Sequence, residues 1–298
     1  MKTQTRRKYI MTNLSDQKWG LYINSVGNQV ISENEAYPPQ NHPTRYLFNT
    51  TNGRVLDEYQ LLYITRGKGI FASESSGRHV VNEGDLFLLF PGEWHSYCPD
   101  PSTGWNEYWI GINGEIIDQW VEKGFFSKES PIFKVGLNED IISLYKRAII
   151  IAEAQEACFQ QALSGIACNL LGMAVYLSKN RSFIGSDVAA QINKAKITIH
   201  ENISTIRPED LAKMMCMSYS RFRKTFKEYT GFAPSQFIQE VKIKTAKEML
   251  TNTFMSVKEI AYELGFENKD YFFTVFRKLT GMTPIHYRKH TQGESLKQ

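Results

Sequence analysis

Six aromatic side chains gather within a short stretch of the N-terminal half of the chain. They are Trp94, His95, Tyr97, Trp105, Tyr108 and Trp109. An indole ring offers a flat apolar surface to the C–H face of a sugar, and polar side-chain tips can hydrogen-bond the sugar hydroxyls once water has left. Taken singly, each of these aromatics is more commonly a residue of an ordinary barrel core.

Glu107 adds a carboxyl group to this stretch. In a β-strand, Glu107 and Trp109 would lie on one face while Asn106 and Tyr108 lie on the other, because successive side chains alternate. Burying an unpaired carboxylate beside an indole is costly, and a plain core gains nothing from it. The pair therefore favours a binding pocket.

A second group of polar residues has the chemistry to contact nucleic acid. The residues are Ser218, Ser220, Arg221, Arg223, Lys224 and Lys227 in one segment, and Asn268, Lys269, Asp270, Thr274, Arg277 and Lys278 in another. Arginine and lysine bind phosphates. Arginine reads guanine, asparagine reads adenine, and serine or threonine can hydrogen-bond to either base. A single such face is more often a solvated surface of a helical bundle.

The elements that carry these two faces are repeats of one another. Residues 222–238 read FRKTFKEYTGFAPSQFI and residues 272–288 read FFTVFRKLTGMTPIHYR, an offset of 50. Upstream, EDLAKMM (209–215) matches KEIAYEL (258–264). Each copy predicts a short helix, a tight turn and a longer amphipathic helix that ends at a glycine. This is the helix-turn-helix outline, whose second helix usually enters the DNA major groove.

Residues 233–252 join the two copies, and their apolar period predicts one continuous helix. At 1.5 Å per residue it would span roughly 27 Å, close to the roughly 34 Å of one DNA turn, so both copies could enter successive major grooves. The charge supports this interpretation. Residues 189–298 contain 18 Lys+Arg against 11 Asp+Glu, whereas residues 1–188 contain 17 against 20. A basic C-terminal third suits a DNA-binding domain.

The remaining segments predict a two-domain α+β protein. We expect an N-terminal arm (1–44), an antiparallel β-barrel (45–136) built from short strands between turn signals, and a helical hairpin (137–180) that either pairs two subunits or packs on the barrel. A linker (181–188), an all-α double helix-turn-helix (189–290) and a tail (291–298) would follow. The scattered cysteines, the absence of a signal-length apolar run and a longest apolar stretch too short to span a bilayer indicate a cytoplasmic protein without a membrane segment.

The duplicated unit, its joining helix and the ending F-x-x-x-x-G-x-T-P-x-x-Y-R (276–288) resemble the DNA-binding domain of the AraC/XylS family of transcriptional regulators. The segment EGDLFLLFPGEWHSY (83–97) resembles the core hairpin of cupin barrels, which serve as effector domains in sugar-responsive members of that family. The resemblance places base-reading positions of the second unit on Lys269, Asp270, Phe273 and Thr274. Phe273 can contact a thymine methyl but cannot hydrogen-bond. We also count Arg288, at the end of the motif, among the DNA contacts.

The same resemblance implies an effector site. Matching the family's sugar pocket puts ligand contacts at Tyr97, Glu107 and Trp109, with His95 nearby. Arg54 is the first candidate for the guanidinium that binds sugar hydroxyls, and Arg45 and Arg66 are its rivals. The family's N-terminal arm can fold over the effector, which makes Tyr37 and His42 candidates.

Cupin enzymes hold a metal with a closely spaced histidine pair, and this chain has Tyr97 where the second histidine would stand. Although His42 and His79 could in principle contribute from elsewhere, we expect no metal, no cofactor and no enzymatic activity. We expect a homodimeric regulator that binds double-stranded promoter DNA, a monosaccharide or small oligosaccharide, and RNA polymerase. One alternative is a DNA-binding regulator whose barrel only dimerises or binds a partner. A remote alternative is a cupin-type sugar isomerase.

Overall fold

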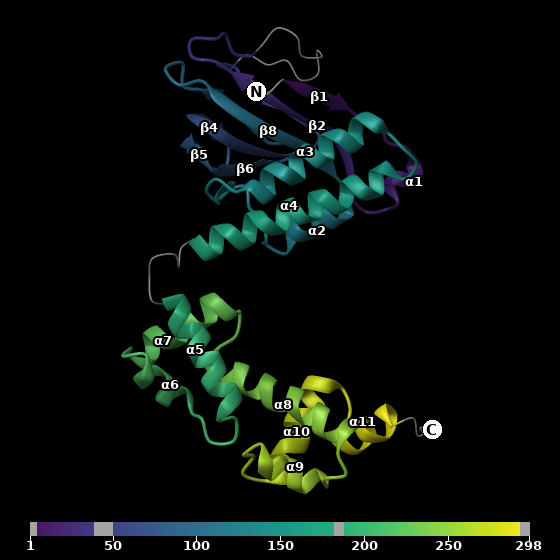
Figure 1. The fold of residues 1–298 in the computed structure, drawn as a ribbon, viewed down its shortest axis with the longest axis vertical. Helices are drawn as coiled ribbons and strands as arrows, with labels where there is room; N and C mark the ends of the chain where they lie inside the picture. The colour runs from purple at the N-terminus through teal and green to yellow at the C-terminus, as the bar shows by residue number, and fades with distance from the viewer. Residues whose placement is uncertain (1–4, 39–49, 182–187, 293–298) are drawn as a thin grey trace. The chain divides into compact units, whose positions relative to one another are not determined.

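The computed structural model describes residues 5–38, 50–181 and 188–292. The chain divides into two compact units, Met1–Ser182 and Phe183–Gln298, and Figure 1 shows the fold of each. The predicted position of His42, the rival Arg45 and nearly all of the predicted linker lie outside the described residues, as does most of the tail.

The N-terminal unit is built on antiparallel strands. They are β1 (Arg6–Tyr9), β2 (Tyr22–Ile31), β3 (Arg54–Val55), β4 (Tyr59–Ser73), β5 (Gly77–Asn82), β6 (Asp85–Leu89), β7 (Trp94–Pro99), β8 (Trp105–Asn113) and β9 (Ile132–Lys134). The long strand β4 joins two parts of the sheet. Its first half pairs with β6 and β8, and its second half pairs with β5 and β7. A register shift between Ile64 and Arg66 lies where β4 changes partners.

The two faces of this sheet bury different clusters of side chains. The interior cluster takes residues from both parts of the sheet, among them Leu62, Phe71 and Trp109. The other face, with Tyr108 and Ile110 on β8, packs against helices. The expected alternation along β8 is therefore confirmed: Trp109 faces the barrel interior and Tyr108 faces the helices.

Strands β1 and β2 correct the predicted boundary of the barrel. Residues 6–9 and 22–31 belong to the sheet, with β2 paired to β8 along its length, and not to a separate arm. The pattern of β2 was missed because most of its residues are buried on both faces and several of them, such as Asn28 and Gln29, are polar. Such a strand shows no alternation of apolar and polar residues. Short helices α1 (Leu14–Gln17) and α2 (Glu115–Glu122) complete the unit's outer parts.

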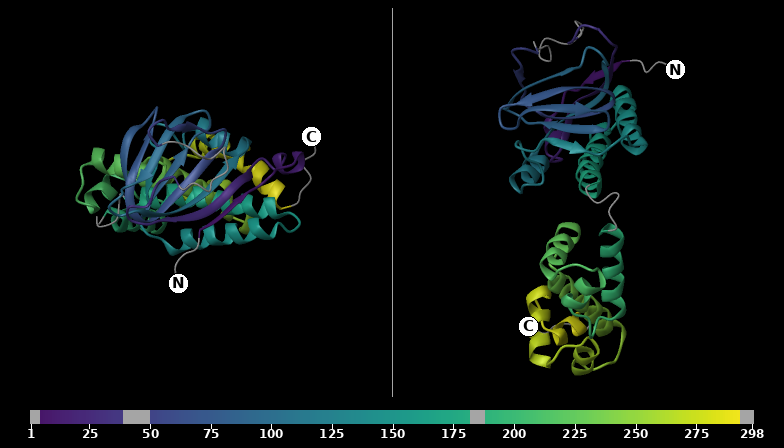
Figure 2. Two further views of the ribbon diagram at one scale, coloured as in Figure 1. Left: turned by 90° about the horizontal axis from the view of Figure 1, so that it is seen from above. Right: turned by 90° about the vertical axis from the view of Figure 1, so that its left-hand side faces the viewer.

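The predicted helical hairpin is present as α3 (Glu139–Ala154) and α4 (Phe159–Arg181), which lie side by side across one face of the sheet (Figures 1 and 2). Buried hydrogen bonds fix it there. Gln160 bonds both the amide and the carbonyl of Ile23, at 3.0 and 2.9 Å, and the Tyr145 hydroxyl donates to the carbonyl of Leu61 at 3.0 Å. Within the described residues, only α4 is long and apolar enough to cross a membrane, and its buried side chains make it a core helix.

The C-terminal unit is all-helical. Its helices are α5 (Val188–Glu201), α6 (Pro208–Met214), α7 (Tyr219–Thr230), α8 (Pro234–Asn252), α9 (Val257–Glu263), α10 (Lys269–Thr280) and α11 (Pro284–Thr291). The joining helix is continuous, as expected, and forms α8. One cluster, with Phe222 and Phe226, packs α5 to α8, and a second, with Phe272 and Phe276, packs α8 to α11. Each helix-turn-helix thus has its own core, and α8 contributes to both.

The two turns differ in one residue type for a steric reason. Cys216 and Gly265 occupy equivalent left-handed positions, with φ of 51° and 66°. Cys216 is exposed, so its side chain has room. A Cβ on Gly265 would lie 1.9 Å from the carbonyl oxygen of Ser204, in the loop before α6. The second turn therefore requires glycine because the first unit's backbone docks against it.

We predict that Gly265→Ala destabilises the C-terminal unit by more than about 3 kcal/mol, because a left-handed alanine costs about 1–2 kcal/mol and the Ser204 backbone must also move. Gly281→Ala is the matched control, since Gly281 has φ of 79° and no atom within 4 Å of its added Cβ. Urea unfolding of a 183–298 fragment, followed by circular dichroism, measures both variants. Equal losses for the two would contradict the docking contact.

Candidate functional sites

The barrel interior brings several of the predicted pocket residues together. Arg54, on β3, donates from Nη2 to the Tyr97 hydroxyl at 2.8 Å and from Nε to Nε2 of His95 at 3.3 Å. The Arg54 guanidinium carbon also lies 5.5 Å from the centre of the Tyr97 ring. Strands β3 and β7 pair at Arg54 and His95, which fixes this arrangement. Among the three arginine candidates, Arg54 lies in the interior, and Arg66 is exposed on β4.

His95 has a defined protonation state. Because its Nε2 accepts from Arg54, its proton lies on Nδ1, which is 3.1 Å from the carbonyl of Glu93 and donates to it. Burial and the neighbouring Arg54 lower the pKa of His95 to about 4. A neutral His95 that accepts from Arg54 positions the guanidinium, and this is the role that the contacts give it.

Glu107 is the second charged group of the interior. It is 4% exposed, and burial raises the pKa of its carboxyl to about 8, although Arg54 and Arg7 act in the opposite direction. Both guanidinium groups therefore lie close enough to favour its ionised form. A carboxyl in this position can exchange a proton near neutral pH.

Trp109 lies on the same face of β8 as Glu107 and packs closely on β2. Its register partner is Gly27, and a Cβ there would lie 2.6 Å from the Trp109 indole. The glycine lets the ring lie directly against the strand backbone. Trp109 is buried and belongs to the same interior cluster as Tyr97.

Two further predicted aromatics do not join this group. Trp94 is partly exposed, and its indole donates to the carbonyl of Asn52 at 2.9 Å. Tyr108 contacts Tyr145 of α3, with ring centres 5.6 Å apart. Tyr37 does join it, with its ring centre 6.3 Å from Tyr97 and 6.1 Å from Trp105.

Strands β1 and β2 bring residues to the interior that the sequence analysis did not identify. Arg7 donates to the Gln29 side chain at 2.6 Å, and its positive charge acts to lower the pKa of the Glu107 carboxyl. Tyr9 packs against the interior cluster. Burial raises the pKa of its hydroxyl, and the charges of Arg7 and Arg54 act in the opposite direction. The alternate spacing of Arg7 and Tyr9 is a strand signal, but four residues are too few to detect it.

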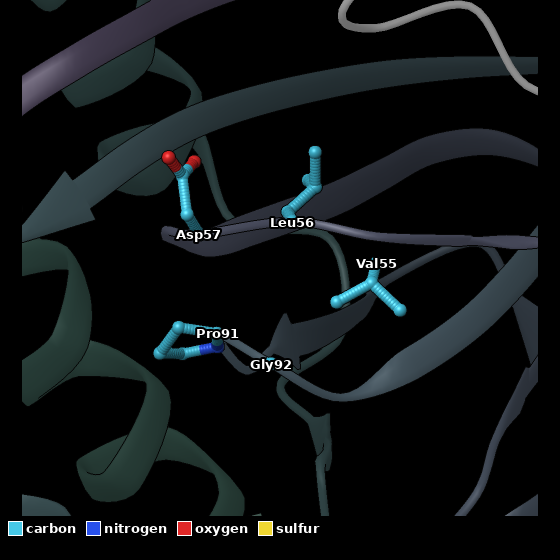
Figure 3. A pocket seen from close by; sticks show the side chains of 5 residues that line it. All are labelled: Val55, Leu56, Asp57, Pro91 and Gly92. Atoms are coloured by element: carbon cyan, nitrogen blue, oxygen red, sulfur yellow. The ribbon is translucent and has the colours of Figure 1, made fainter.

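A hollow of about 670 Å³ borders this interior, lined by Val55, Leu56, Asp57, Pro91 and Gly92 (Figure 3). The turn after β3 and the turn before β7 form its walls. Its lining contains none of the predicted effector contacts, so it is separate from the candidate pocket.

The first nucleic-acid face lies on α7. Ser220, Arg221, Arg223, Lys224 and Lys227 are all exposed, while Phe222 and Phe226 are buried beneath them. Ser218 caps the helix, and its hydroxyl accepts from the amide of Arg221. The helix therefore presents four basic side chains on its exposed side, as the predicted contacts with phosphates and base edges require.

The second face, on α10, is less basic. Lys269, Asp270, Thr274, Arg277 and Lys278 are exposed. Asn268 caps the helix by accepting from the amide of Tyr271 at 2.7 Å, and the Thr274 hydroxyl donates to the carbonyl of Asp270 at 2.9 Å. Phe273 is half-buried, with the Lys269 ammonium 5.3 Å from its ring centre.

Arg288, the last of the predicted DNA contacts, bonds backbone carbonyls within its own unit. Its Nε donates to the carbonyl of Leu250 at 3.2 Å, and its Nη2 donates to the carbonyl of Met255 at 2.5 Å. These carbonyls lie at the end of α8 and in the loop that follows it. The guanidinium satisfies backbone acceptors at a helix end, which stabilises the second unit, and its contact with DNA stays a prediction.

The two buried titratable groups predict a pH dependence of stability. The folded pKa of Glu107, about 8, exceeds its ordinary value of 4.5, so its contribution is complete below 4.5 and is lost as the pH rises to 8. His95 has the opposite shift, from 6.5 to about 4, so its contribution is complete above 6.5. Between pH 6.5 and 8 Glu107 therefore dominates.

We predict that the wild-type free energy of unfolding falls by about 2 kcal/mol between pH 6.5 and 8, at 1.36 kcal/mol per pKa unit, and that Glu107→Gln removes this fall. All five tryptophans precede residue 182, so their fluorescence during urea unfolding reports on the N-terminal unit alone. Parallel pH profiles for the two proteins would show that Glu107 is ionised in the folded state throughout.

Comparisons with known proteins match both units. A family model described as an AraC-like ligand binding domain matches residues 40–170, and one described as a helix-turn-helix domain matches residues 211–290.

Curated relatives extend over most of the chain. The raffinose operon transcriptional regulatory protein of Pediococcus pentosaceus is 26% identical over 242 residues, which cover 79% of this chain and 86% of that protein. The MmsAB operon regulatory protein of Pseudomonas aeruginosa is 25% identical over 242 residues, covering 80% and 78%. The arabinose operon regulatory protein of Escherichia coli is 26% identical over 239 residues, covering 77% and 80%.

Proposed function

The chain belongs to the AraC family of transcriptional regulators, which are not enzymes, and we propose that it couples a small polyhydroxylated effector, a sugar in the first instance, to the binding of promoter DNA. The effector would bind inside the N-terminal barrel. We propose further that the protein works in the cytoplasm, as a homodimer that acts on RNA polymerase.

One observation carries the effector assignment. A buried indole, a buried carboxyl and a half-buried guanidinium lie close together in the barrel: Trp109, Glu107 and Arg54. Removing a carboxyl group and part of a guanidinium from water has a desolvation cost that apolar side chains in a structural core would not have. A sugar uses all three groups, because its C–H face covers an indole and its hydroxyls accept from guanidinium and donate to carboxyl groups.

The names of the relatives support a sugar. One is a raffinose operon regulator and another an arabinose operon regulator, whereas the name of the MmsAB operon protein indicates no sugar. At about a quarter identity these relatives support the chemical class and not one compound.

The α3–α4 hairpin supports the proposed dimer. Ile150 on α3 and Tyr176 on α4 are large apolar residues that stay 57% and 60% exposed after the hairpin has packed on the sheet. Apolar side chains left uncovered on both helices suit a surface that a second copy would bury.

The more basic face on α7 makes Arg223 the residue to test first. We predict that Arg223→Ala weakens operator binding by about 1–3 kcal/mol and relaxes the preference at one base pair, as loss of a bidentate base contact would. Competition binding against random DNA measures the ratio of specific to non-specific affinity. A ratio that stays at its wild-type value would assign Arg223 to a phosphate or to solvent.

For the barrel, we predict that Trp109→Ala lowers the affinity for an effector sugar at least tenfold, about 1.4 kcal/mol, because the stacking surface is lost. A thermal-shift screen of monosaccharides and small oligosaccharides identifies the sugar, and quenching of tryptophan fluorescence measures its affinity. DNA binding by a 189–298 fragment should be unaffected by any of these sugars. If wild type and Trp109→Ala bind every stabilising sugar equally, the pocket lies elsewhere.

A further inference from the structure

Two of the buried side-chain polar atoms that lack a hydrogen-bond partner among the described residues lie on one face of β8. They are the indole nitrogen Nε1 of Trp105 and the carboxyl oxygen Oε2 of Glu107. Both side chains are almost fully buried, at 0% and 4% exposure. Buried polar atoms are nearly always hydrogen-bonded, and leaving one unpaired costs about 1–3 kcal/mol. A pair of them in one interior points to a group that the chain itself does not supply.

The two atoms are neighbours. Trp105 and Glu107 stand two residues apart on β8 and so share the inward face of that strand. The indole lies close enough to the carboxyl to favour its ionised form, although the two make no hydrogen bond of acceptable geometry.

The orientation of the indole is fixed by packing. The far edge of its six-membered ring lies against β4, where a Cβ on Gly69 would be 2.7 Å from Cζ3. The edge of the Tyr37 ring packs on the same indole, with centres 6.1 Å apart and planes at 85°. The Nε1 edge is opposite Cζ3, so the N–H points away from β4 and cannot turn to another partner without displacing this packing.

The chemistry of the pair selects its ligand. Trp105 Nε1 can only donate a hydrogen bond, whereas Glu107 Oε2 accepts one both in the ionised carboxyl and when the proton is on Oε1. A hydroxyl group does both through a single oxygen. A carboxylate would accept from the indole but oppose Glu107, and an ammonium would donate to Glu107 but could accept nothing from the indole.

We propose that Trp105 Nε1 and Glu107 Oε2 together bind one hydroxyl group of the effector, which makes Trp105 a specificity-determining residue for a neutral polyol. The hydroxyl oxygen accepts from the indole and its proton is donated to the carboxyl. This inference rests on the proposed function for the identity of the pocket, but the pair of atoms exists whatever the effector is.

The first experiment uses D-glucose, D-galactose, L-arabinose, lactose and raffinose, with monodeoxy, uronic acid and amino analogues of the monosaccharides. For a sugar that binds, Trp105→Phe should lower the affinity about tenfold, as loss of one buried hydrogen bond does. One monodeoxy analogue should bind the wild type about tenfold more weakly than its parent, but bind Trp105→Phe as tightly as the parent does. Trp94→Phe, which removes an indole outside the interior, is the control.

A double-mutant cycle tests the sharing of one hydroxyl. Glu107→Met keeps the length of the side chain and removes its oxygens. If both residues bind the same hydroxyl, the double variant should lose much less affinity than the two single losses combined. Additive losses, an unchanged affinity in Trp105→Phe, or a preference for the charged analogues would each overturn the proposal.

A second experiment does not depend on finding a sugar. In a crystal of the full chain soaked in glycerol, a glycerol hydroxyl or a water should lie within hydrogen-bond distance of both atoms. A protein atom bonded to the Trp105 indole nitrogen would overturn the proposal even if sugars bind. If the hydroxyl or water is present and no sugar binds, the pair stands and the assignment of a sugar effector fails.

Discussion

The hydrogen bonds of the half-buried Arg54 are the interaction on which the interior of the N-terminal unit depends. A guanidinium inside a barrel must be held by acceptors, and Tyr97 and a neutral His95 provide them at 2.8 and 3.3 Å. This requirement fixes the proton of His95 on Nδ1 and places β3 against β7. The carboxyl of Glu107 then faces positive charge on one side and an unsatisfied indole on the other. For the proposed effector, side chains held in place in advance would lower the cost of ordering the site on binding.

The sequence predicts the parts of this interior that depend on local pattern. Alternation along β8 suffices to place Glu107 and Trp109 on one face, and the repeated turns suffice to find both helix-turn-helix units. Arg7 and Tyr9 reach the interior only through the pairing of β1 with β2, which joins residues about twenty positions apart and leaves no periodic mark in four residues. The backbone contacts of Arg288 could not be predicted for a related reason. Its partners, the carbonyls of Leu250 and Met255, depend on how α11 packs on the end of α8. The sequence alone does not distinguish an arginine that contacts DNA from one that bonds a backbone carbonyl.

The two copies of the helix-turn-helix have diverged where their surroundings differ. The left-handed residue of the turn is exposed in the first copy, which tolerates Cys216, and is pressed on Ser204 in the second, which retains Gly265. The second turn also has one more residue between that position and the helix cap, Asn268 instead of Ser218. The faces diverge as well, since α7 carries four exposed basic residues between Ser218 and Lys227, while α10 mixes Asp270 and a half-buried Phe273 with its three. The same fold therefore supports one strongly basic face and one mixed face.

The contact between Gly265 and Ser204 has a consequence for the promoters that such a protein can serve. Backbone held against backbone leaves little freedom to change the distance between the two recognition helices. A base substitution in one half-site then changes affinity by about 1–3 kcal/mol, which a population of promoters can tolerate. An inserted base pair instead turns the second half-site by roughly a tenth of a helical turn and removes it from reach of its helix. For a regulator that binds DNA through both helices, operators would be free to drift in sequence over evolutionary time while their half-site spacing stays constant.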